Sequence, residues 1–585
     1  MLNARLYRTC WLVAGVALVV ALLTLESPNR GPQPALPASV DGQSTLELTG
    51  TLQAVAPERP AGSEADLVAA RVVQNQFSQL PGMGGRVQVQ EFEARVDGRR
   101  VGMQNVYISV PGTSGGSARD GVVVVAPRDT PRGVSAGASS TAVMLRLARL
   151  SVTTRHLRPH LFVSTDGSTL GHAGIRWFLE RFSSFPISSV MVLDGLGDAE
   201  GDRIHVWSRG TDSSQALHMA RLAEDSITRV GGRPEAIPGL GNQLARLAVP
   251  QTAGDQGPAV SAGFPAVTLS GREDSPLRDG PAPTAERLEL AANAAYDLLT
   301  VLDQPDTIMA PDGRLALAGR DVRPTVARLA LLLLTLPLIV LAVDVAARAR
   351  RLRIRLGRGA AAVARRAAPI ATVLVGGYVL VLLGVWPGTA AGAPPQPADV
   401  GFGLPALAGL LGLAALTFLV ARLTRSRPRR TEDDEPDPTE GAGGLVLLAL
   451  LMAVLWLASP YALLLALPAA HALLLASAAE RVWQVGALAA VGTVPLLLMI
   501  RSIGSAIDSD PFFATWYLLE TTTSGARGAV GPLFAVAIGA CLWAMLAHAL
   551  ERAREIALAG GAPRRRRRPR LRLSVERVPV GRRRR

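Results

Sequence analysis

The sequence predicts a protein of two parts: an α/β domain with a mostly parallel sheet, followed by an all-α multi-pass transmembrane bundle. Strand-like and helix-like stretches alternate over residues 45–303. Apolar runs of about 17–22 residues, enough to cross a bilayer as helices, recur from residue 323 onward. The chain has 585 residues, 49% hydrophobic and 18% charged, so it is too long for one domain and too apolar for an ordinary soluble protein.

The α/β domain is predicted element by element from its apolar patterns. The run VVVVA at 122–126 is typical of a strand buried on both faces. Further strands are expected at 159–165, 187–194 and 264–270, and helices at 138–150, 170–182 and 284–303. Parallel sheets place their sites at the carboxyl ends of strands, which here carry Asp129, Thr165, Asp166 and Asp194.

Eight membrane crossings are expected. The first apolar run, 9–25, fits a signal peptide or a signal anchor, and we favour an uncleaved anchor. Pro460 either separates two crossings or bends one longer hairpin. The other runs lie near 326–346, 367–386, 402–421, 443–459, 460–477, 483–500 and 528–549.

Charge predicts the orientation in the membrane. All 61 basic residues are arginine and the net charge is +14, so no lysine is present for Schiff-base chemistry. Arginines gather in 347–366, in 422–430 and in the tail 561–585, beside apolar runs. Such segments stay in the cytoplasm and contact anionic lipid. We therefore expect both termini in the cytoplasm, the α/β domain outside the plasma membrane, and no nucleic-acid partner.

Segment 508–526 should face outside the membrane and contains Phe512, Trp516 and Glu520. It fits an aromatic belt at the membrane interface or a lipid or partner contact. The observations above also divide the chain into parts. The predicted divisions are an anchor at 1–30, a linker at 31–44, the extracytoplasmic domain at 45–303, a linker at 304–322, a seven-helix transmembrane bundle at 323–550 and a basic tail at 551–585.

Residues 59–270 resemble the zinc aminopeptidases of clan MH, which carry two co-catalytic zinc ions. The resemblance lies in segments that occur in the same order along the chain and predicts an aminopeptidase-like fold. The segments are RPAGSEADLVAARVVQNQF (59–77), QNVYISVPGT (104–113), VVVVAPRDT (122–130), GASSTAVMLRLARL (137–150), FVSTDGSTLGHAGIRWF (162–178), VMVLDGLG (190–197) and GFPAVTLSG (263–271).

The same resemblance implies a degenerate metal site. Two zinc ions need several nitrogen or oxygen ligands and a general base. Pro127 stands where the family has a histidine, Ser139 or Ser140 where it has the bridging aspartate, and Thr165 where it has the base. The family's last histidine falls near Arg278 or Asp279. Vestigial ligands would be Asp129, Asp166 and Asp194, in a groove with Pro127, Ser139, Ser140, Thr165 and His172.

Other chemistries stay open at these residues. An oxygen-only site of Asp129, Asp166, Asp194 and Asp279 would suit calcium or magnesium better than zinc. A Ser139/His172/Asp166 constellation is conceivable, although nothing in the spacing demands it. His156 and His160 fit loop residues better than ligands.

The architecture as a whole resembles the glycosylphosphatidylinositol anchor attachment protein, the peptidase-like subunit of a transamidase, although the composition is typical of bacteria. The resemblance implies a non-catalytic scaffold or substrate-binding subunit at the membrane surface, with a protein partner or polypeptide substrate and no cofactor. The alternative is an active membrane-bound metallopeptidase or amide-bond transferase with divergent ligands, which would bind zinc. A transporter is disfavoured because the spans show no repeat and few paired charges.

Overall fold

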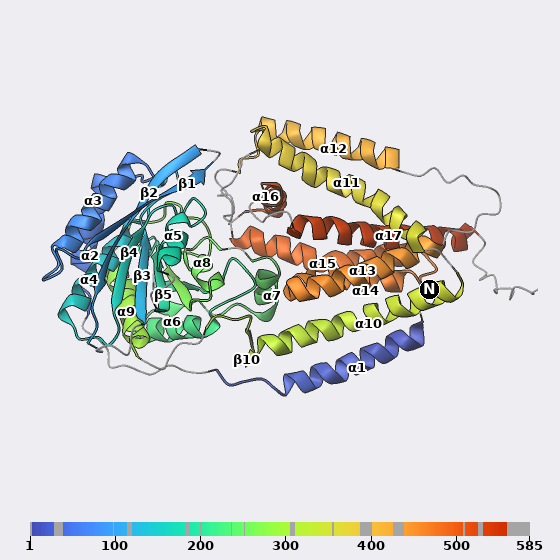
Figure 1. The fold of residues 1–585 in the computed structure, drawn as a ribbon, viewed down its shortest axis with the longest axis horizontal. Coiled ribbons are helices and arrows are strands. Elements are labelled where there is room, and N and C mark those ends of the chain that lie inside the picture. The colour runs from blue at the N-terminus through green and yellow to red at the C-terminus, as the bar shows by residue number, and fades with distance from the viewer. Residues whose placement is uncertain are drawn as a thin grey trace, which may run out of the picture.

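The computed structural model contains an α/β domain joined to a helical bundle (Figure 1). The residues whose structure is described are 3–28, 39–96, 99–113, 120–182, 186–198, 202–235, 237–250, 252–304, 310–353, 356–386, 400–424, 438–506, 509–524 and 530–558.

The domain is built on an eight-stranded sheet with the order β1-β2-β4-β3-β5-β8-β6-β7. Its four central strands, β4-β3-β5-β8, are all parallel, whereas β2 and β6 run antiparallel to the central strands beside them. This confirms the predicted α/β class. The strands are β1 (Gln88–Val96), β2 (Arg99–Val110), β3 (Gly121–Pro127), β4 (His160–Thr165), β5 (Ile187–Asp194), β6 (Arg203–Trp207), β7 (Arg233–Pro234) and β8 (Ala266–Ser270).

Helices cover the central strands, which explains why these strands are almost entirely apolar. Val122, Val123, Val124 and Val125 of β3 are fully buried, as a strand packed on both faces must be. Helices α4 and α9 contact β5, and α8 contacts β5 and β8 (Figure 1). The domain helices are α2 (Gly42–Val55), α3 (Glu64–Ser78), α4 (Ala138–Thr153), α5 (Ala173–Arg181), α6 (Leu217–Arg229), α7 (Leu240–Ala248), α8 (Gln256–Ser261) and α9 (Ala285–Leu302).

The bundle consists of apolar helices, as the hydropathy predicts. Seven helices of the described chain, the N-terminal α1 (Ala4–Leu22) among them, are long and apolar enough to cross a membrane. They indicate a multi-pass membrane protein. The bundle helices are α10 (Pro324–Arg351), α11 (Leu356–Leu382), α12 (Leu404–Thr424), α13 (Pro438–Ala458), α14 (Leu463–Ala476), α15 (Val482–Ala506), α16 (Pro511–Thr523) and α17 (Val530–Leu558).

Three segments differ in detail from the expectation. The region 443–477 forms a full-length helix, α13, and then a short 3-10 turn with the 14-residue α14, so Pro460 does separate two helices. The predicted linker contains a hairpin of β9 (Leu315–Leu317) and β10 (Arg320–Val322). In α16, Trp516 is buried against Trp386, whereas Phe512 is 63% exposed. The tail beyond residue 558 lies outside the described residues.

Helix α1 is an integral part of the bundle. It packs against α10, and the Tyr7 hydroxyl lies 3.0 Å from Nδ1 of His471 in α14 (Figure 1). After the helix, Glu26 pairs with Asp321 of the hairpin through backbone hydrogen bonds, and its carboxylate forms ion pairs with Arg314 and Arg323. The N-terminal segment therefore contacts both the bundle and the hairpin that leads into it.

Candidate functional site

A small cavity lies where β3 and β5 end, at the carboxyl-terminal edge of the sheet. Its volume is about 50 Å³, and both polar and apolar side chains line it. Of the residues expected in the groove, Pro127, Asp129, His172 and Asp194 line this cavity. The lining also includes Gly137, Ser168, Thr169, Ala253, Arg272, Pro276 and Leu277.

Asp129 is held by hydrogen bonds from the turn after β4. Its Oδ1 accepts from the Ser168 amide at 2.9 Å. Its Oδ2 accepts from the amide and the hydroxyl of Thr169, at 2.8 and 2.7 Å. Burial, together with the nearby Asp166 charge, raises the pKa of Asp129 to about 6. Both oxygens are therefore already engaged with the protein.

Asp194, at the end of β5, is paired with a cation of the protein itself. Its Oδ2 accepts a hydrogen bond from Nη2 of Arg272 at 2.7 Å, and both side chains are largely buried. The guanidinium also donates to the Ser275 carbonyl at 2.7 Å and lies 4.9 Å from the centre of the Trp207 ring. A positive charge in this position opposes the binding of a metal cation beside Asp194.

Asp255, which sequence reasoning did not identify, gathers three polar side chains under the cavity. Its carboxylate accepts from Thr165 Oγ1 at 3.0 Å and from Ser168 Oγ at 2.8 Å, and Nδ1 of His172 lies 2.9 Å away. Because a carboxylate only accepts, Nδ1 carries the proton and Nε2 of a neutral His172 keeps its lone pair. No motif marks Asp255, which lies 83 residues from His172 along the chain.

The backbone of His172 adopts an unusual conformation. Its φ of 59° lies in the left-handed region, where a non-glycine residue costs about 1–3 kcal/mol. The neighbouring Gly171 also has a positive φ, of 77°. This turn directs the imidazole of His172 to Asp255 rather than to the Asp166 expected from sequence.

Asp166 faces away from the cavity, toward Arg128 and Asp66. Nη2 of Arg128 lies 2.7 Å from Asp66 and 3.5 Å from Asp166, and all three side chains are buried. The amide of Gly62 donates to Asp166 at 3.2 Å. Burial, and then the adjacent Asp66, raises the pKa of Asp166 to about 7. The two buried carboxyl groups therefore share the single guanidinium of Arg128.

Ser139, Ser140 and Asp279 hold neighbouring loops together. The two serine hydroxyls accept from the amides of Gly197 at 3.0 Å and Leu196 at 3.2 Å. Asp279 accepts from the amides of Ser135 and Ala136 at 2.8 and 3.1 Å. None of the three lines the cavity beside Asp129 and Asp194, so the structure does not assemble the oxygen-only cation site considered above.

In the described part of the chain, the cavity contains no group of three histidine, cysteine or carboxylate ligands within reach of one ion. What it offers chemically is an oriented imidazole, a paired guanidinium and an apolar rim. Such a site can bind a small polar group and accept a proton at Nε2 of His172.

Comparisons with known proteins give a likeness only in fold. No family model matches the chain, and no curated protein matches it. A glutaminyl cyclase from an Acidobacteriales bacterium is 18% identical, with a TM-score of 0.37, over 47% of this chain and 99% of that one. The zinc aminopeptidase BSAP from Bacillus subtilis is 13% identical, with a TM-score of 0.37, over 45% of this chain and 95% of that one. A Zn-dependent exopeptidase from Parabacteroides distasonis is 13% identical, with a TM-score of 0.35, over 46% and 99%.

Proposed function

We propose that this chain is a multi-pass membrane protein whose α/β domain binds a polypeptide end or a protein partner outside the membrane, without metal-dependent hydrolysis. In this role the domain is a scaffold or substrate-binding subunit similar to the anchor attachment protein. Both termini lie in the cytoplasm, in keeping with the arginine-rich segments between the spans.

The ion pair between Arg272 and Asp194 carries this proposal. A two-zinc hydrolase needs several ligands with available electron pairs. Here Asp194 is neutralised by a guanidinium, and Asp129 accepts three hydrogen bonds. Binding a metal between them would require the protein to displace Arg272 and leave it buried without its partner, at a cost of several kcal/mol.

Peptidase assays on the full chain in detergent test the absence of hydrolysis. Aminoacyl p-nitroanilides are offered with Zn²⁺ or Co²⁺, to the natural protein and to Asp194→Asn. We expect the same background rate for both. Turnover in the natural protein that Asp194→Asn abolishes would refute the proposal.

Peptide binding tests the other half of the proposal. Fluorescent decapeptides with a free or blocked amino end, and a free or amidated carboxyl end, are titrated against the full chain. Ala253→Trp fills the cavity and should weaken binding at least tenfold, whereas Ala94→Trp on β1, away from the cavity, should leave binding unchanged. Equal binding by Ala253→Trp and the natural protein would remove the cavity from the proposal.

The pair of His172 and Asp255 favours the enzymatic alternative. A carboxylate that orients an imidazole is the arrangement used for general-base catalysis. If amide-bond cleavage or transfer is detected without added metal, His172→Gln should lower its rate by about 10²–10⁴-fold. An unchanged rate would eliminate His172 as the base.

A further inference from the structure

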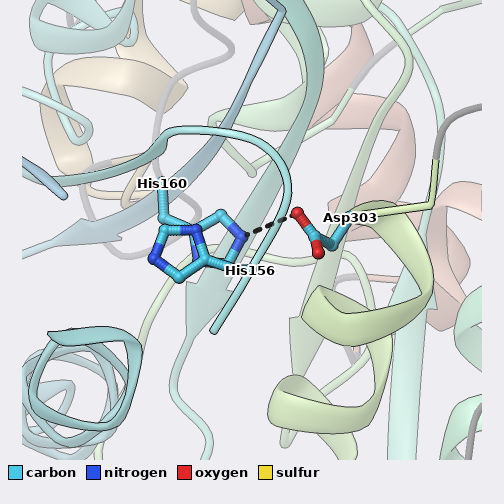
Figure 2. Close-up of side chains that lie close together, drawn as sticks. All are labelled: His156, His160 and Asp303. Carbon is cyan, nitrogen blue, oxygen red and sulfur yellow. Dashed lines mark ion pairs between the residues drawn. The ribbon is translucent and has the colours of Figure 1, made fainter. Parts of the chain in front are cut away.

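A second polar cluster lies at the opposite edge of the sheet. It contains His156, from the loop before β4, His160, the first residue of β4, and Asp303, which follows α9 (Figure 2). All three residues are buried, and one ligand atom from each lies within 4.8 Å of the others. The length of β4 separates this cluster from the cavity by about 17 Å, at about 3.3 Å per residue.

Each histidine keeps a ring nitrogen available. Nδ1 of His156 lies 2.6 Å from the Arg158 carbonyl, which only accepts, so Nδ1 carries the proton and Nε2 keeps its lone pair. Nδ1 of His160 bonds to Ser151 Oγ at 3.1 Å. Nε2 of His160 is buried without a hydrogen bond in the described chain and lies 3.6 Å from Asp303 Oδ1, the pair marked by the dashed line in Figure 2.

The carboxylate is fixed in place from the other side. Asp303 Oδ1 accepts from the amides of Leu157 and Arg158 at 2.9 and 2.7 Å, and Oδ2 accepts from Leu157 at 2.8 Å. A carboxylate has about four acceptor positions, so it can still bind an ion. Thus both imidazoles and the carboxylate are oriented by outer hydrogen bonds, which is how proteins orient metal ligands.

We propose that His156, His160 and Asp303 form a binding site for a divalent first-row transition metal such as zinc or cobalt. Two imidazoles and one carboxylate are ligands that such ions prefer, with water in the remaining position. The ion would join the loop before β4 to the end of α9, where the chain leaves the domain toward the bundle. The site is independent of the function proposed above.

The cluster must contract when the ion binds. Tetrahedral ligands at about 2.0–2.1 Å from zinc lie about 3.3 Å apart, less than the present limit of 4.8 Å. The two imidazoles are stacked, with centroids 4.0 Å apart and planes 14° apart, so lone pairs that lie in the two ring planes cannot meet at one ion. One ring has to tilt, and the loop position of His156 allows this movement.

Metal titration of the full chain in detergent tests the site. After chelator treatment and buffer exchange, Zn²⁺ is titrated against the natural protein, His156→Gln, His160→Gln and a control, His205→Gln. His205 is a largely buried imidazole that pairs with Glu235 elsewhere in the domain. We expect one equivalent in the natural protein and in the control. Loss of one ligand should weaken binding by at least about 100-fold, because even outer-shell changes cost 10–100-fold.

A fourth variant separates this site from the cavity. Asp129→Asn/Asp194→Asn should bind Zn²⁺ as the natural protein does. If that variant loses the metal while His160→Gln keeps it, the ion lies in the cavity, and both this inference and the non-catalytic proposal fail. If all variants bind as the natural protein does, or if the natural protein binds none, only the site at His156, His160 and Asp303 is overturned.

X-ray absorption spectroscopy of the natural protein loaded with Zn²⁺ or Co²⁺ identifies the ligands directly. It uses no variant, so the result does not depend on whether the histidine variants fold. We expect two imidazole nitrogens at about 2.0–2.1 Å, with oxygen ligands beside them. A shell of oxygen ligands alone would overturn the site.

Discussion

The two edges of the same sheet carry polar clusters with opposite properties. At the carboxyl-terminal edge, Asp129 accepts three hydrogen bonds and Asp194 is paired with Arg272. At the amino-terminal edge, His160 presents a buried nitrogen that lacks a hydrogen bond within the described residues, beside His156 and Asp303. The number of acidic residues is larger at the first edge, but within the described residues only the second edge brings two imidazoles and a carboxylate together.

This difference shows why residue type alone does not indicate a metal site. A carboxylate that faces a guanidinium offers a cation little, because the two positive charges repel each other. When one nitrogen of an imidazole is fixed by a hydrogen bond, the other nitrogen presents its lone pair in a defined direction, ready to bind a metal. The edge at which we expected the remains of a metal site from the sequence is therefore the poorer candidate for a metal.

Removal of Arg128 should have the largest effect at the carboxyl-terminal edge. Arg128→Met leaves Asp66 and Asp166 buried without their cation and should destabilise the domain by about 3–5 kcal/mol. Arg71→Met, which breaks an exposed pair with Glu64, should cost less than about 1 kcal/mol. Hydrogen-exchange mass spectrometry of peptides from β3 and β4 measures both. Similar protection in the two variants would contradict the prediction.

Substitution of Asp255, which contacts Thr165, Ser168 and His172, should destabilise the domain by the next largest amount. Asp255→Ala leaves Thr165, Ser168 and His172 without their acceptor, which should cost about 1–3 kcal/mol for each donor that water cannot reach. Asp279→Ala removes an exposed acceptor and should change the same exchange rates far less. The assignment of Asp255 as the organising residue fails if the two variants behave alike.

At the amino-terminal edge, Ser151 should position the ligand His160. Ser151→Ala removes the partner of Nδ1 and should weaken Zn²⁺ binding by about 10–100-fold, measured by competition with a chelating dye. Ser189→Ala is the matched control, because Oγ of this buried serine makes no hydrogen bond in the described chain. Unchanged affinity in Ser151→Ala would indicate that His160 is oriented by packing alone.

The burial of Asp166 should also make the stability of the domain depend on pH. Asp166 has a pKa of about 7 in the folded state against an ordinary value of 3.8, so the folded state binds more protons between these values. Its contribution is therefore present at low pH and is lost as the pH rises toward 7. Asp166→Asn should flatten the profile of unfolding free energy between pH 4 and 7. An unchanged slope would contradict the assignment.

The elements were predictable because their signals are local. The predicted strand at 159–165 is β4 (His160–Thr165), and the predicted helix at 138–150 is α4 (Ala138–Thr153). Burial on both faces requires an uninterrupted apolar run, which the sequence shows directly. The membrane helices were predictable for a similar reason, since a bilayer requires long apolar segments.

The site was less predictable. Thr165 and Asp166 are adjacent at the end of β4 and were both expected in the groove. Successive side chains of an extended chain point to opposite sides, so Thr165 reaches Asp255 while Asp166 reaches Arg128. His156 and His160 were expected to be simple loop residues, because their partner Asp303 lies 143 residues beyond His160 in the sequence.

The sequence by itself determined the two-part architecture and the order of the main elements. Only the tertiary structure decided which charges meet: Arg272 with Asp194, His172 with Asp255, and His160 with Asp303. The reason is physical. Periodicity and hydropathy act over a few residues, whereas the availability of a lone pair depends on neighbours that packing brings from distant parts of the chain.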